Sequence, residues 1–213
     1  MNTDELAKLL ATGAEPVDPR VPLRRFALAV GAGIVVAAIV MAEWLGVRST
    51  LADDVAAPML WIKFAFVAWL AVGGWMATLR LARPGASLAR VPGTLAGPVL
   101  AMWLLAAVAL AGADAPRRAE LVFGQTWGEC LVNIAVLSLP VFAAALWGMK
   151  GFAPTRLRLA GAAAGLLAGG AGAFVYTFHC PELAAPFLGV WYVLGVLAPV
   201  ALGALIGPHV LRW

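Results

Sequence analysis

Six long apolar stretches occupy most of this chain and determine what it can fold into. They cover roughly residues 26 to 46, 57 to 79, 92 to 112, 126 to 147, 158 to 178 and 184 to 206. Each is long enough to cross a bilayer as an α-helix, which takes about 20 residues. With 63% hydrophobic and 12% charged residues, the chain has too little polar surface for a soluble protein. The sequence predicts an all-α polytopic membrane protein with six transmembrane helices.

Basic residues are unequally divided between the two sets of connecting segments. The N-terminal tail, the segments 80–91 and 148–157 and the C-terminus form one set, with Lys8, Arg20, Arg24, Arg25, Arg80, Arg83, Arg90, Lys150, Arg156, Arg158 and Arg212. The opposite set has only Arg48, Arg117 and Arg118. Because basic loops resist translocation, the first set is predicted to be cytoplasmic. Both termini then lie in the cytoplasm, with residues 1–24 as a tail and 25–213 as the transmembrane domain.

Two features inside the spans bear on packing. Gly161, Gly165 and Gly169 recur every four residues, so the fifth helix offers a flat stripe for close approach by a neighbour. Lys63 lies about six residues into the second span, where an ammonium is costly unless it finds a partner. Glu43 and Glu129 lie at comparable depth and are its candidate partners. This intramembrane charge has two possible roles: an ion pair that holds helices together, or a direct part in function.

The two cysteines, Cys130 and Cys180, are predicted to lie at the same outer face of the membrane. Cys130 begins the fourth span and Cys180 ends the fifth. The short loop near 148–157 makes these helices antiparallel neighbours, which would bring the two sulfurs together. Outside the cytosol such a pair can form a disulfide, whereas a cytosolic pair would stay reduced.

The neighbours of the cysteines favour a reactive pair. Glu129 precedes Cys130, and His179 precedes Cys180. Thiolate and imidazole suit soft metals such as Zn, Cd or Cu(I), and an imidazolium beside a thiol raises its reactivity. We therefore expect these four residues to sense metal or oxidants, with the two thiols as metal ligands. The alternative is that the cysteines are small apolar fillers. No resident cofactor is expected, only a transient heavy-metal ion at the cysteine pair.

A short amphipathic helix is predicted over residues 3–12. Asn2 and Glu5 have the spacing of a capping box, and Gly13 ends the pattern. The apolar stripe of this helix consists of three leucines at helical spacing, Leu6, Leu9 and Leu10. A helix this short is marginal alone in water, so the stripe needs a surface to dock on.

The charge of this helix favours a protein partner over a membrane surface. Asp4 and Glu5 outnumber Lys8, whereas helices that bind membrane surfaces are usually rich in Lys and Arg. The candidate partner-binding residues are therefore the three leucines with Asp4 and Glu5. A stiff, extended connector is predicted after the helix, with Pro16, Pro19 and Pro22. A frayed terminus with incidental leucines is the alternative.

Four short motifs combine with the six spans into a recognisable pattern. They are MNTDEL at residues 1–6, EPVDP at 15–19, WGEC at 127–130 and HCP at 179–181. With this combination the whole chain resembles the negative regulator of sigma F (NrsF) family.

The resemblance implies a six-helix anti-sigma factor of the bacterial inner membrane, not an enzyme. Such a protein would hold an extracytoplasmic-function sigma factor through its cytoplasmic N-terminal segment, here residues 1–19. It would release the factor under metal or oxidative stress sensed by paired extracytoplasmic cysteines, here Cys130 and Cys180. The expected partners are that sigma factor and the lipid bilayer. Direct nucleic-acid binding is not expected, because loop arginines placed by membrane orientation explain the pI of about 9.6.

Two other classes of membrane protein remain as alternatives. A thiol oxidoreductase that passes electrons to quinone would normally carry a C-x-x-C pair, which this chain lacks. A small-solute transporter would place polar groups near the membrane midplane, whereas the charges here lie at helix ends.

Overall fold

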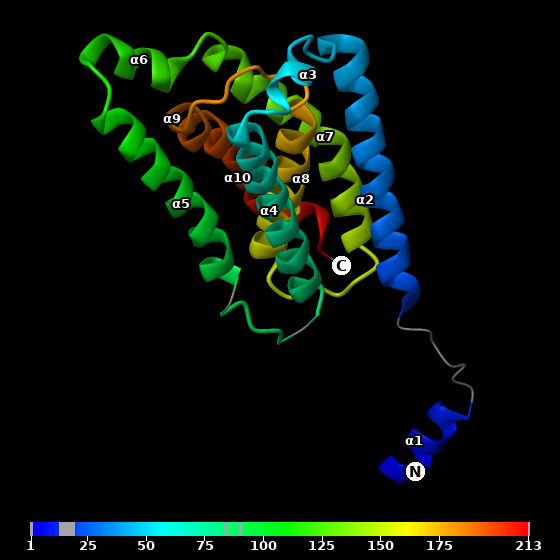
Figure 1. Cartoon of the computed structure of the whole chain (residues 1–213). Coiled ribbons are helices and arrows are strands. Elements are labelled where there is room, and N and C mark those ends of the chain that lie inside the picture. The colour runs from blue at the N-terminus through cyan, green and yellow to red at the C-terminus, as the bar shows by residue number, and fades with distance from the viewer. Residues whose placement is uncertain (1, 13–19, 84, 90, 213) are drawn as a thin grey trace.

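The computed structural model describes residues 2–12, 20–83, 85–89 and 91–212, and the regular structure in these ranges consists of helices joined by turns and loops (Figure 1). The elements are α1 (Thr3–Ala11), α2 (Arg20–Val40), the π-helix η1 (Met41–Leu45), α3 (Leu51–Asp54), α4 (Pro58–Leu81), α5 (Val91–Ala111), α6 (Ala115–Phe123), α7 (Trp127–Met149), α8 (Leu157–Tyr176), α9 (Ala185–Phe187), the π-helix η2 (Leu188–Tyr192) and α10 (Val193–Val210). Gly13, Pro16 and Pro19 of the predicted connector lie outside the described residues.

The prediction of six membrane-spanning helices is confirmed. Within the described residues, six helical segments are long and apolar enough to cross a bilayer: Val21–Leu45, Pro58–Leu81, Val91–Ala111, Ala115–Met149, Leu157–Tyr176 and Ala185–Val210. Their bounds differ from the predicted ones by a few residues, except that the fourth includes the amphipathic helix α6. Pro22 lies in the first turn of α2, so the prediction that it belongs to an extended connector is wrong. Proline is tolerated there because first-turn N–H groups have no helical acceptor.

Helix α8 forms the centre of the bundle. In its apolar stretch 78% of the residues are buried, against 11% in α5. Helix α8 packs most extensively on α10, α4 and α7, and α2 packs on α7 from outside. Figure 1 shows α5 diverging from the others at the edge of the bundle.

The predicted glycine stripe explains how α8 reaches this central place. A Cβ atom on Gly161 or Gly165 would overlap the carbonyl oxygen of Gly203 or Pro199, and one on Gly169 would lie 2.8 Å from Val196 O. All three contacts are to α10. Helices α8 and α10 therefore pack backbone to backbone. Within lipid the hydrophobic effect does not drive helices together, and the close van der Waals packing that small residues allow stabilises the contact instead.

The bundle has two different ends. We call the end with α3, α6 and the segment after α8 the cysteine end, because Cys130 and Cys180 lie there. We call the other end the basic end, because it carries Arg80 in the last turn of α4 and Arg83, Lys150 and Arg156 in the α4–α5 and α7–α8 connections. Figure 1 shows the two ends at opposite poles of the helices.

Candidate functional site at the cysteine end

The site begins where the chain leaves α8. After Tyr176 the backbone continues in tight turns, and the N–H of Cys180 still donates to Tyr176 O at 3.0 Å. Pro181 follows and cannot continue the pattern, because it has no N–H. The carbonyl groups of Cys180 and Glu182 therefore need partners other than helical N–H groups.

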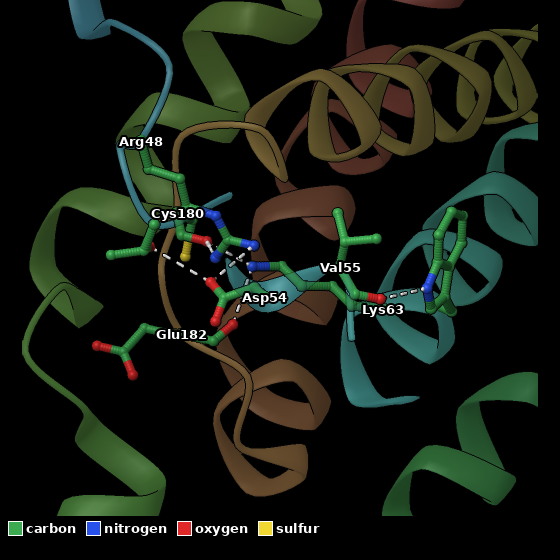
Figure 2. A network of polar contacts seen from close by, with 8 residues as sticks. Arg48, Asp54, Val55, Lys63, Cys180 and Glu182 are labelled. Atoms are coloured by element: carbon green, nitrogen blue, oxygen red, sulfur yellow. Dashed lines mark hydrogen bonds and ion pairs between the residues drawn. The ribbon is translucent and has the colours of Figure 1, made fainter. Parts of the chain in front are cut away.

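Two basic side chains supply these partners. Arg48 Nη1 donates to Cys180 O at 2.8 Å, and Lys63 Nζ donates to Cys180 O and Glu182 O at 2.9 Å each. Figure 2 shows both side chains converging on the Cys180 carbonyl from different elements. Hydrogen bonds from a charged donor are stronger than those between neutral groups. The segment after α8 is thus attached to α4 and to the connection before α3.

Lys63 is fully buried, and the dipoles of backbone carbonyl groups stabilise its positive charge in place of a carboxylate. Its ammonium also lies 4.9 Å from the centre of the Tyr192 ring, which adds a cation–π contact. The predicted pairing with Glu43 or Glu129 is wrong, because both carboxylates are on exposed residues. The C-terminal end of a helix, here that of α8, carries partial negative charge on its free carbonyl groups, and this charge attracts the Lys63 ammonium.

Sequence reasoning missed Arg48 as part of the site. Its side chain is 5% exposed, and its Nη2 lies 3.4 Å from Asp54 Oδ2 in an ion pair. The signal was present, because Arg48 is the sole basic residue of the 47–56 loop and an aspartate pair follows it at Asp53 and Asp54. The ion pair holds the guanidinium in position to donate to Cys180 O.

The far side of the segment is tied to the connection between α6 and α7. Glu182 Oε1 accepts from the N–H of Gln125 at 2.7 Å. Gly124 has φ +53°, and a Cβ there would lie 2.6 Å from the Glu182 carboxyl group. Trp191 of η2 donates from Nε1 to Val122 O of α6 at 2.8 Å. These contacts close the cysteine end over the segment that carries Cys180.

The two cysteines lie in one buried cluster but are not joined. Both are free thiols with no exposed surface, and their sulfurs are apart. Cys130 lies in the first turn of α7. The expected gathering of both thiols with His179 and Glu129 does not occur: Glu129 is exposed, and His179 Nδ1 lies 2.9 Å from Gly46 O. In the part of the chain that the structure describes, no three His, Cys, Asp or Glu residues could hold a metal ion together.

The N-terminal helix α1 is the second candidate region. The predicted capping box forms, with the N–H of Asn2 donating to Glu5 Oε2 at 3.3 Å. Its leucine stripe is uncovered, with Leu6, Leu9 and Leu10 exposed by 42%, 65% and 71%. No residue of α1 is buried. The helix thus presents an apolar face without an intramolecular partner among the described residues.

A six-span helical bundle with an uncovered amphipathic helix and a closed, thiol-bearing end defines a class: a multi-pass membrane protein. The comparison with protein families identifies it more closely. The sequence model of the family "Negative regulator of sigma F" (NrsF) matches residues 10–213. The chain belongs to the NrsF family, and the resemblance predicted from its motifs is confirmed.

Relatives match over the full length of both chains. The chain is 51% identical to a protein of Azospira oryzae named "Probable anti-sigma-F factor NrsF", covering 100% of each. It is 40% identical to "Anti-sigma-F factor NrsF" of Caulobacter vibrioides, again covering 100% of each. No solved structure matches the chain.

Proposed function

We propose that the protein is a membrane-bound anti-sigma factor that sequesters an extracytoplasmic-function sigma factor. The observation that carries the proposal is the full-length match to proteins named anti-sigma-F factors, at 40% and 51% identity. An anti-sigma factor acts by binding, so its chain needs a surface for a protein partner, and α1 offers one.

The exposed stripe of α1 is the proposed sigma-factor contact. Its apolar groups, Leu6, Leu9 and Leu10, fit an apolar groove on the partner, the common mode by which amphipathic helices are recognised. Asp4 and Glu5 lie in the first turn of the helix, Glu5 beside the stripe, and together they favour a partner with basic residues around the groove. Binding would also stabilise a helix of 9 residues, which is marginal in water on its own.

The proposal places the basic end and α1 in the cytoplasm of a bacterium and the bundle in its inner membrane. The support is the excess of basic residues at that end, because Lys and Arg are enriched in cytoplasmic loops. A sigma factor is a cytoplasmic protein, so α1 must lie on that side to bind it. The cysteine end then faces the extracytoplasmic space.

We also propose that Cys130 and Cys180 sense metal or oxidative stress at that outer end, flanked by His179 and Glu129. Support comes from their placement at one end of the bundle and from the oxidising character of extracytoplasmic compartments. Since both thiols are fully buried, the closed bundle is the resting state that holds the sigma factor. Modification of the thiols by an oxidant or a soft metal requires the cysteine end to open and would stabilise the opened form.

A capture experiment tests the proposed function. Full-length protein in detergent is incubated with purified extracytoplasmic-function sigma factors of the same cell, beside a variant that lacks residues 2–12. We expect one sigma factor to bind the full-length protein and at least about 100-fold weaker binding to the truncated one, since three leucines at about 1 kcal/mol or more each would be lost. Absence of capture by the full-length protein would reject the anti-sigma function. Equal capture by both forms would reject α1 as the contact.

A further inference from the structure

The structure points to Arg48 and Lys63 as positioning residues that keep the Cys180 thiol closed. We propose that these two side chains, which we call the carbonyl clamp, set the threshold at which Cys180 becomes reactive. This inference deepens the proposed sensing function and rests on it, but the closure itself can be measured without a sigma factor. Both side chains hydrogen-bond to the backbone of the segment that carries the thiol.

The clamp holds the segment at points on both sides of the cysteine. Before it, the backbone N–H of Arg48 donates to Phe178 O at 3.2 Å. At the cysteine, Arg48 Nη1 and Lys63 Nζ share Cys180 O, and beyond it Lys63 reaches Glu182 O. The donors come from the connection before α3 and from α4, 132 and 117 residues before Cys180, so the segment cannot move away from α4 without breaking charge-assisted bonds.

Burial gives the clamp its strength. The Lys63 side chain has no exposed surface and that of Arg48 has 5%, so water cannot replace the lost acceptors while the bundle stays closed. A buried donor left without an acceptor is costly, which makes the closed arrangement strongly favoured over a partly loosened one. Opening of the segment is therefore expected to break these hydrogen bonds together.

The closed state explains why the Cys180 thiol is inaccessible at rest. Cys180 is 0% exposed although the chain around it is not helical and lies at the end of the bundle. Pro181 and Glu182, its neighbours, are partly or fully exposed, so a small displacement of the segment would bring the thiol to the surface. The hydrogen bonds of the clamp oppose this displacement, because they hold the segment against α4 and the connection before α3.

The test measures how fast Cys180 reacts with a charged maleimide. The protein is the full chain in detergent with Cys130→Ser, so that Cys180 is the sole thiol. We expect Lys63→Met and Arg48→Gln each to raise the labelling rate about tenfold or more, as loss of a hydrogen bond to a charged group predicts. Arg48→Lys retains a charged donor and should restore most of the protection. Two variants with independent positions keep the test decisive if one of them does not fold.

Arg118→Gln is the matched control. Arg118 Nε also donates to backbone carbonyls at the cysteine end, but to those of Leu110 and Ala113 and not to the Cys180 segment. Its labelling rate should equal that of the parent. Unchanged rates in both clamp variants, or equal acceleration by Arg118→Gln, would overturn the proposal.

A second readout separates the clamp from the proposed function. If sensing works as proposed, the clamp variants with both cysteines intact should release the captured sigma factor at an oxidant concentration about tenfold lower than the parent requires. Faster labelling without any sigma-factor capture would support the clamp and reject the anti-sigma function. Unchanged labelling with normal capture and release would reject the clamp and leave the function in place.

Discussion

Replacing Gly165 by alanine tests the backbone contact between α8 and α10. The added Cβ would overlap Pro199 O and lie 2.6 Å from Pro199 C and 2.7 Å from Val200 Cα. These are backbone atoms of a helix, which cannot rotate aside as a side-chain end can. Overpacking a well-packed contact costs about 1–3 kcal/mol, whereas alanine in place of glycine within a helix contributes about 1 kcal/mol of stability. We expect a net loss of up to about 2 kcal/mol.

Gly31→Ala provides the control for the helix-propensity gain. Gly31 lies in α2, also within a span, and no atom lies within 4 Å of the position its Cβ would take. The substitution there should be neutral or stabilising by up to about 1 kcal/mol. The difference between the two variants then isolates the packing cost of Gly165, about 1–3 kcal/mol.

Thermal unfolding of the purified protein in detergent measures this difference. For a chain of this size 1 kcal/mol shifts the unfolding midpoint by about 2–4 °C, so Gly165→Ala should unfold roughly 2–12 °C below Gly31→Ala. A midpoint of Gly165→Ala at or above that of the unmodified protein would refute the close packing of α8 on α10. A midpoint of Gly31→Ala below that of the unmodified protein would instead show that α2 is packed more tightly around Gly31 than described.

Three further predictions concern the two candidate regions. Leu6→Ser, Leu9→Ser and Leu10→Ser combined should weaken sigma-factor binding at least about 100-fold in a Kd measurement, while Lys8→Ser with Ala11→Ser on the opposite face leaves it unchanged; equal Kd values would exclude the stripe. Gly124→Ala should lower the unfolding midpoint, because φ +53° and the Glu182 carboxyl group leave no place for a Cβ, whereas Gly128→Ala, with open space around it, should not. Cys130→Ser with Cys180→Ser should retain the sigma factor yet abolish stress-induced release; persistent release would place the sensor elsewhere.

The parts of the structure that the sequence predicts correctly depend on local or periodic signals. The six spans follow from hydrophobic length, the α1 cap from the Asn2 and Glu5 spacing, and the close approach of a neighbouring helix to α8 from glycines one turn apart. Each of these features needs only neighbours along the chain or one face of a helix. These features can therefore be predicted from residues that are close together in the sequence.

The arrangement of the site could not be predicted in the same way. The acceptors of Lys63 are backbone carbonyls, which every residue has, so no residue type marks them in a sequence. The separation of the two sulfurs depends on how α7 is turned about its axis and on the path of the backbone after α8. In α7, one residue of shift rotates a side chain by about 100°. The alternation of spans and loops correctly predicted that Cys130 and Cys180 lie at the same end of the bundle, but it could not predict the direction in which each side chain points.

Helix α8 links the two candidate ends of the molecule. Its C-terminal continuation carries Cys180, and Arg156 and Arg158 lie at its start, at the basic end. Because its glycine and alanine faces pack on backbone, displacement at one end cannot be absorbed by side-chain rearrangement and moves the helix against its neighbours. A tenfold change in sigma-factor affinity needs about 1.4 kcal/mol of difference between the two states. One charge-assisted hydrogen bond of the clamp, at about 1.5–3 kcal/mol, is enough to supply it. We infer that release of the Cys180 segment and release of the sigma factor are coupled through α8, so substitutions on its α10-facing glycines should change the oxidant dose for release without touching either end.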